Sequence, residues 1–251
     1  MPPPLPDIRA LAVRQWRDYR LGTPGTCFGE THPPLHLSDA YRIQREVARL
    51  RQEAGDGVVG YKVGCIGPGI IEQFGMAGPI RGYLHASEMQ RSGATLRHDA
   101  YANLAIEGEM AVTIGADGSI TAAFPVIELH HFVFRGARKT LVELVSNNGL
   151  NAGAVLPAFD RRLPLDRWIV SRALTVTING VTIASGGLWS MPGGVDEVIA
   201  WLAAQLKQSD ERLAPGDLVL TGTPLGLHPV RPGDKVVVSV DGAAFVDCEI
   251  V

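Results

Sequence analysis

The chain has 251 residues, of which 46% are hydrophobic and 20% charged, as is usual for a globular protein with a sizeable core. A net charge of -3 and a pI of about 6.2 argue against nucleic acid or an anionic membrane surface as a partner. Cys27, Cys65 and Cys248 form neither a disulfide framework nor a zinc motif, so we expect reduced thiols and a cytoplasmic location. The first residues lack a signal-peptide core and no apolar run reaches ~20 residues, so no membrane association is expected.

The first residues of the chain have the spacing of helices. Apolar side chains recur at helical intervals over residues 8–19, and Ser38-Asp39 suits the start of a second helix that ends near residue 53. The segment 22–34 between them is rich in glycine and proline, which predicts a loop. Because the pattern changes after residue 57, we expect a helical N-terminal part at 1–57 and a β-rich catalytic body at 58–251.

The body is predicted to be mainly β, which makes the fold class α+β. Residues 58–64 have the composition of a short strand. Asn179-Gly180 suits a tight hairpin turn, and Asp241-Gly242 repeats this signal near the end of the chain. Residues 196–208 are expected to form an amphipathic helix.

Two glutamates, Glu107 and Glu109, stand inside an apolar run rich in β-formers at 103–114. Residues two apart in a strand point to the same face. Two carboxylates side by side in an apolar setting repel one another and lose hydration, and a hard divalent cation relieves both costs. A solvated edge strand is the commoner explanation of a bare Glu-x-Glu. The apolar neighbours Ile106 and Met110 favour the cation site here.

Six segments together resemble the fumarylacetoacetate hydrolase superfamily, in its branch of 2-keto-4-pentenoate hydratases and 4-oxalocrotonate decarboxylases. In chain order they are residues 40–44 (AYRIQ), 60–64 (GYKVG), 106–109 (IEGE), 124–129 (FPVIEL), 201–203 (WLA) and 215–223 (PGDLVLTGT). The resemblance implies a β-roll fold that carries a divalent metal, Mg²⁺ or Mn²⁺. Its ligands would be Glu107, Glu109 and a third carboxylate, which falls on Glu128.

The resemblance also implies an activity. Three carboxylates leave about three of six octahedral positions for water or substrate, and a 2-keto acid can fill two of them. A metal there acts as a Lewis acid, which serves hydration, decarboxylation and C–C cleavage alike. We therefore expect a metal-dependent lyase for a small 2-keto acid or its dienol, first of all a 2-keto-4-pentenoate-type hydratase in aromatic-compound catabolism. The alternatives are a 4-oxalocrotonate-type decarboxylase, an acylpyruvate hydrolase, and a non-catalytic keto-acid-binding relative or partner subunit.

Four further residues are candidates for contact with substrate. Lys62 matches the lysine of the family's Gly-x-Lys-x-Gly segment and is the predicted catalytic residue; burial would lower its pKa for proton transfer, or its charge would hold a carboxylate. The alternative is a lysine snorkelling from a strand end. Arg81 is a candidate for a second substrate carboxylate, Asn148 for a hydrogen bond to substrate, and Thr221 for an anion at a strand end. A surface arginine, a turn residue and a plain strand end are the corresponding structural alternatives.

Two positions depart from the family pattern. Ile80 stands where the hydratase branch carries an acidic residue, and Asn147 where it often shows an aspartate. The lysine–aspartate pair would then be absent, which keeps the alternative activities open. His130 shares a strand face with the third carboxylate, so a mixed carboxylate and histidine site is conceivable, although a histidine pair is more often structural and the family uses oxygen ligands. His85 and Glu88 lie in a predicted loop after Gly82, from which they would supply an acid–base pair.

The resemblance implies a homo-oligomer, with a partner enzyme of the same pathway as a further expectation. The glycine-rich segment 64–69 lacks Gly-x-Gly-x-x-Gly spacing and βαβ surroundings, so nucleotide binding is not predicted.

Overall fold

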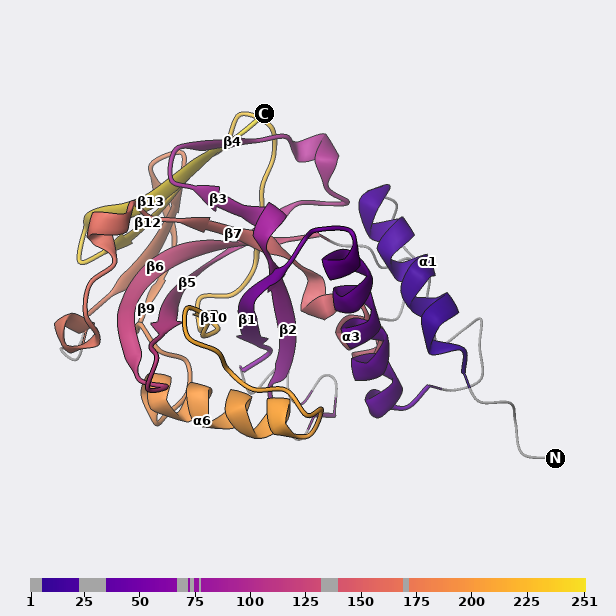
Figure 1. Ribbon diagram of the computed structural model, residues 1–251. Helices are drawn as coiled ribbons and strands as arrows, with labels where there is room; N and C mark the ends of the chain where they lie inside the picture. The colour runs from indigo at the N-terminus through magenta and orange to yellow at the C-terminus, as the bar shows by residue number, and fades with distance from the viewer. Residues whose placement is uncertain are drawn as a thin grey trace.

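The structure is a computed structural model in which two β-sheets pack face to face beside a small group of helices (Figure 1). The described residues are 6–22, 35–66, 72, 75–76, 78–131, 140–168 and 172–251. The loop predicted at 22–34, which includes Cys27, therefore lies almost wholly outside them. No helix of the described segments combines the length and apolar character needed to span a bilayer.

Two helices, α1 (Ile8–Arg20) and α3 (Leu37–Glu53), pack against each other next to β1 and β2 (Figure 1). Asp7 caps α1 by accepting a hydrogen bond from the N–H of Ala10 at 3.0 Å. Helix α3 begins slightly earlier than predicted, because the carboxylate of Asp39 reaches back to the N–H of His36. The facing apolar side chains are Leu11, Ala12, Ile43, Val47 and Leu50. The division of the chain at residue 57 stays a prediction.

The larger sheet holds eight strands within the described residues, in the order β2-β1-β10-β5-β6-β7-β3, with β11 paired to β5. Its strands are β1 (Val58–Gly64), β2 (Ile80–His85), β3 (Met89–Arg91), β5 (Ala105–Ile114), β6 (Ile120–His130), β7 (Asn151–Leu156), β10 (Leu218–Leu220) and β11 (His228–Pro229). The sheet curls until β2 contacts β7. Its inner face carries an apolar cluster that includes Leu84, Ala111, Phe124 and Leu220.

The smaller sheet has the order β4-β13-β12-β8-β9. Its strands are β4 (Ala94–Leu96), β8 (Leu174–Ile178), β9 (Val181–Gly186), β12 (Lys235–Val240) and β13 (Ala243–Ile250). Asn179-Gly180 joins β8 to β9, and all four central residues of this turn and of Asp241-Gly242 have positive φ, as a type I′ turn requires. The hairpin predictions are confirmed.

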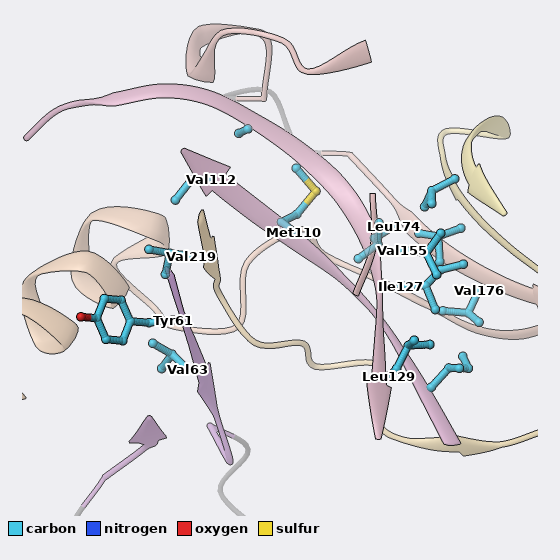
Figure 2. Close-up of a cluster of buried hydrophobic side chains, with 14 of the residues drawn as sticks. Tyr61, Val63, Met110, Val112, Ile127, Leu129, Val155, Leu174, Val176 and Val219 are labelled. Carbon is cyan, nitrogen blue, oxygen red and sulfur yellow. The ribbon is translucent and has the colours of Figure 1, made fainter. Parts of the chain in front are cut away.

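The main core lies between the two sheets. Figure 2 shows Met110 and Ile127 of the larger sheet beside Leu174 and Val176 of the smaller one. Gly108 lies at a close approach of the two sheets, since a Cβ there would stand 2.4 Å from Val176 Cγ2. The predicted amphipathic helix is α6 (Gly194–Lys207), which adds Leu202 and Leu206 to this core. A short helix, α5 (Leu141–Ser146), leads to the 3-10 turn Asn148–Leu150. The predicted mainly β fold with a small helical part is confirmed.

Candidate metal centre

Four acidic or imidazole side chains meet on the inner face of the curled sheet. The antiparallel register of β5 and β6 places Glu107 directly opposite Glu128. Strand alternation brings Glu109 to the face of Glu107, and His130 to the face of Glu128. Gly108 points the other way, toward the smaller sheet, which has no room for a side chain at this position. In the Glu-Gly-Glu motif, the two glutamates therefore face the cluster, and the glycine between them allows the smaller sheet to pack against β5.

The tightest group within this cluster consists of Glu107, Glu128 and His130. Their nearest ligand atoms all lie within 4.8 Å of one another. His130 Nε2 is 3.3 Å from Glu107 Oε2 and 3.5 Å from Glu128 Oε2. Burial by itself lowers the pKa of His130, but the carboxylates of Glu128 and Glu107 raise it to about 9. Two carboxylates and an imidazole this close form a donor set that fits a divalent cation.

Glu109 is fully buried, and neither of its carboxylate oxygens has a hydrogen-bond partner among the described residues. Burial is the main reason why its pKa is raised well above the usual value, and the charges of Glu128 and Glu107 add to the effect. An unpartnered carboxyl in the interior is costly unless a proton or a cation satisfies it. This residue supports the predicted cation site, although it lies outside the tightest group.

Glu128 has a different partner at each of its two oxygens. Oε1 accepts a hydrogen bond from Asn151 Nδ2 at 2.7 Å and lies 3.4 Å from Lys62 Nζ, whereas Oε2 faces His130. Burial would raise the pKa of Glu128, but the charges of Lys62 and His130 and the bond from Asn151 lower it. The sequence analysis did not select Asn151. The signal available was a polar residue at the start of an otherwise small and apolar strand, Asn-Ala-Gly-Ala-Val-Leu.

Lys62 is buried and stays charged. Burial by itself lowers its pKa, but the carboxylate of Glu128 more than offsets this, and the pKa is raised. Of the two roles left open for Lys62, this raised pKa favours a charged ammonium that holds a carboxylate. Glycines make room for the side chain, because a Cβ at Gly64 would stand 2.9 Å from Nζ and one at Gly149 2.7 Å from Cε. Ile80 Cδ1 would meet the same Gly149 Cβ at 3.2 Å, so an apolar side chain lies beside the lysine.

Asn148 is placed close to Lys62, but its amide group is engaged elsewhere. Oδ1 accepts from the N–H of Tyr83 at 2.7 Å, and Nδ2 donates to the C=O of Tyr83 at 2.8 Å. Because β2 is an edge strand, the N–H and C=O of Tyr83 have no neighbouring strand to bond, and the amide of Asn148 bonds them instead. This arrangement favours the structural alternative for Asn148.

Arg81 is not brought to the carboxylate cluster. In the pairing of β1 with β2, Lys62 lies opposite Gly82 and Arg81 opposite Val63, so Arg81 and Lys62 point to opposite faces. The guanidinium is buried and donates to Ser209 Oγ at 3.2 Å and to Glu211 Oε2 at 3.1 Å. The guanidinium is thus engaged inside the protein, and this geometry favours a structural role over a contact with substrate.

Thr221 follows β10 directly after Leu220, which pairs with Ala111 of β5. Its register position is opposite Met110, to whose carbonyl oxygen both the hydroxyl, at 2.8 Å, and the N–H, at 3.0 Å, donate. The hydroxyl is buried and occupied, so the geometry favours a plain strand end.

His85 and Glu88, the predicted acid–base pair, are not joined by a hydrogen bond or an ion pair in the described part of the chain. His85 ends β2, and burial together with the charge of Arg51 lowers its pKa to about 4. Glu88 lies in the 3-10 turn Ala86–Glu88, where Arg51 holds its carboxylate at 2.7 Å and Tyr19 donates a hydrogen bond to it. These contacts tie the turn to α1 and α3.

The curled sheet has the architecture expected of a β-roll, and the ligand atoms gathered on its inner face form a group that fits a divalent cation. Residues 143–251 match the model of the fumarylacetoacetate (FAA) hydrolase C-terminal family. A 4-oxalocrotonate decarboxylase of Pseudomonas putida is 25% identical over 88% of each chain. A 2-keto-4-pentenoate hydratase of Burkholderia vietnamiensis is 26% identical over 95% of each chain. These matches confirm the resemblance to the fumarylacetoacetate hydrolase superfamily in its hydratase and decarboxylase branch.

Solved structures show the same fold. The 4-oxalocrotonate decarboxylase from Pseudomonas putida G7, complexed with magnesium and adipate, superposes with a TM-score of 0.91 at 21% identity, over 99% of this chain and 100% of that one. A fumarylpyruvate hydrolase from Pseudomonas aeruginosa, in complex with Mn²⁺ and pyruvate, gives a TM-score of 0.58 at 18% identity over 76% of this chain and 88% of that one. Both neighbours hold a divalent cation, which agrees with the predicted Mg²⁺ or Mn²⁺.

Proposed function

We propose that this chain is a metal-dependent lyase for a small 2-keto acid or its dienol, and that it acts as a 2-keto-4-pentenoate-type hydratase. The observation that carries the proposal is the cluster of half-buried Glu107 with buried Glu128 and His130, whose ligand atoms lie within 4.8 Å of one another beside Lys62. Relatives named as hydratases of 2-keto-4-pentenoate, of 2-hydroxyhexa-2,4-dienoate and of 2-oxo-hept-4-ene-1,7-dioate, each 24–26% identical to this chain, support the substrate class.

The position of each residue in the cluster indicates its proposed role. Glu107, Glu109 and Glu128 would hold the metal, which supplies Lewis acidity toward the oxygens of a 2-oxo acid. Lys62 holds a proton at Nζ beside the cluster and is the group placed to give it to, or to orient, a bound acid. Ile80 and Leu150 provide an apolar wall near this lysine, which limits the access of water.

Decarboxylation is the second candidate, because of what surrounds Lys62. Its nearby carboxylate is Glu128, which belongs to the candidate metal centre, and Ile80 supplies no second acid. Adding water to a carbon chain needs a group that activates the water, whereas loss of CO₂ does not. The relative named 4-oxalocrotonate decarboxylase, 25% identical, supports the same alternative.

The three candidate activities are separated by their products. Purified protein with Mg²⁺ or Mn²⁺ would be given 2-hydroxypenta-2,4-dienoate, 4-oxalocrotonate or an acylpyruvate. Loss of the dienol absorbance without CO₂ means hydration, release of CO₂ means decarboxylation, and cleavage of the acylpyruvate means hydrolysis. No turnover of any substrate, with oxalate still bound, would favour the non-catalytic keto-acid-binding relative.

One pair of variants tests the proposed centre directly. Glu107→Gln should abolish metal-dependent turnover because it removes a charged ligand. Glu249→Gln is the control, since this glutamate is exposed on β13 and pairs with Lys235 at 3.0 Å. Full activity of Glu107→Gln with metal still bound would contradict the assignment.

A homo-oligomer, a partner enzyme of the same pathway and a cytoplasmic location complete the proposal. Edge strand β9 leaves Val181 61% and Ile183 44% exposed, which supports self-association through this edge. Light scattering on Val181→Lys beside the wild type would test it, with a fall in mass expected for the variant.

A further inference from the structure

His130 is a buried imidazole without a hydrogen-bond partner. It lies at the end of β6, 4% exposed, two residues after Glu128 and on the same face. Neither Nδ1 nor Nε2 makes a hydrogen bond within the described part of the chain. A polar group that is buried in this way needs a partner, since burial without one is costly.

The position of Nε2 is that of a ligand atom. A divalent cation with bonds of about 2.1 Å holds adjacent octahedral ligands at roughly 3.0 Å from each other. Nε2 stands 3.3 Å from Glu107 Oε2 and 3.5 Å from Glu128 Oε2. All three ligand atoms lie within 4.8 Å of one another, a spacing somewhat wider than that around a bound ion, so an ion would draw them closer together.

The charges of the cluster favour a cation at the same place. Glu107, Glu109 and Glu128 carry three negative charges when ionised, and Lys62 carries one positive charge. A divalent cation between Glu107 and Glu128 offsets the remaining negative charge, and opposite charges that balance in this way are tolerated in a protein interior.

We propose that His130 Nε2 is a metal ligand together with Glu107 and Glu128, and that this nitrogen shifts the preference of the centre from Mg²⁺ toward first-row transition metals such as Mn²⁺, Co²⁺ and Zn²⁺. The inference rests on the metal centre of the proposed function. Mg²⁺ prefers oxygen ligands, whereas imidazole suits the transition metals. A purely carboxylate set, which the family resemblance implied, would lack this selectivity.

Equilibrium dialysis of the metal-free protein against Mg²⁺ and Mn²⁺ measures the preference. In His130→Leu we expect the dissociation constant for Mn²⁺ to rise by about tenfold or more, while the dissociation constant for Mg²⁺ changes little. Loss of a residue that only hydrogen-bonds a metal ligand already weakens binding by about tenfold, and loss of a ligand should weaken it at least as much. The control is His98→Gln, because His98 lies in the 3-10 turn His98–Ala100 away from the cluster, and both constants should be unchanged.

Pulsed electron paramagnetic resonance gives a readout that does not depend on turnover. Mn²⁺ bound to the wild type should show coupling to a ¹⁴N nucleus, and His130→Leu should lose it. His130→Gln is the second variant, which offers an oxygen in place of the nitrogen and keeps the test open if His130→Leu does not fold. Thermal unfolding of the metal-free variants checks the fold.

The outcomes separate this inference from the proposed function. Mn²⁺ without nitrogen coupling in the wild type, or an unchanged ratio of the two constants in His130→Leu, would overturn the role of His130 alone. Tighter binding of both ions by His130→Leu would also overturn it, since the imidazolium would then compete with the metal. A wild type that binds neither ion overturns both proposals. Metal binding without turnover of any substrate counts against the activity only.

Discussion

Lys62 and Glu128 form a buried ion pair at the end of the candidate metal centre. Nζ lies 3.4 Å from Oε1, and the two side chains are 3% and 1% exposed. The other oxygen of Glu128 faces His130 at 3.5 Å. One carboxylate therefore links the lysine to the group that would hold a cation, so the charge at either place affects the other.

Lys62→Met tests whether the lysine acts on substrate or only balances charge. The shape of the side chain is kept and the charge is lost, so we expect metal binding to survive while turnover falls by about 100-fold, as for the loss of an acid–base group. Isothermal titration with Mn²⁺ and a steady-state assay of dienol consumption measure the two effects. The control is Lys235→Met, because Lys235 is exposed at the start of β12. Unchanged turnover would assign Lys62 to structure.

Asn151 is predicted to be a positioning residue for Glu128. Its Nδ2 donates to Oε1 at 2.7 Å, and its Oδ1 accepts from the N–H of Gly153 at 2.9 Å, so the amide is held on both sides. Asn151→Leu keeps the volume and removes the bond, and Mn²⁺ affinity should fall by about 10- to 100-fold. Isothermal titration would measure this, with exposed Gln52→Leu on α3 as the control. An affinity equal to that of the wild type would remove Asn151 from the centre.

The sequence was sufficient to predict features that depend on residues close together in the chain. Glu107 and Glu109 share a face because strands alternate, and two hairpins follow from Asn-Gly and Asp-Gly turns. The facing of His130 and Glu128 follows from the same rule. These relationships need only a correct assignment of a strand.

Features set by register between distant strands were not predictable in this way. Arg81 and Lys62 lie on neighbouring strands, but Arg81 pairs with Val63 and not with Lys62. This shift of one residue in register turns the side chain of Arg81 to the other face of the sheet. Asn148 and Thr221 are occupied by backbone groups of β2 and β5, which are remote in the chain. Nothing local to these residues indicates such partners.

Gly108 should be the least replaceable residue of the Glu-Gly-Glu motif for stability. A Cβ there would stand 2.4 Å from Val176 Cγ2 and 3.0 Å from Val238 Cγ2, so Gly108→Ala should destabilise the fold by about 1–3 kcal/mol through overpacking. Urea unfolding of the single variants, and of Gly108→Ala combined with Val176→Ala, would measure the coupling. We expect the double variant to be more stable than the sum of the single effects predicts. If the effects of the two single variants on the free energy of unfolding simply added up, the alanine side chain at position 108 would not be in contact with Val176.

The buried His85 should make stability depend on pH away from the metal centre. Burial and Arg51 lower its pKa to about 4, while Asp56 opposes this, compared with about 6.5 when unfolded. Because the folded pKa is depressed, this contribution to the free energy of unfolding is complete above the unfolded pKa and is lost as the pH falls toward the folded one.

From about pH 7 to about pH 5 the loss amounts to roughly 2 kcal/mol from this residue. Urea unfolding of metal-free protein at both pH values should show this difference between the wild type and His85→Gln, which has no titrating group at this position. Other groups contribute equally to both proteins and cancel in the comparison, and His98→Gln should behave as the wild type. If His85→Gln kept the full pH dependence, the imidazole would be exchanging protons freely, and the packing of α1 and α3 over the end of β2 would have to be looser than the structure shows.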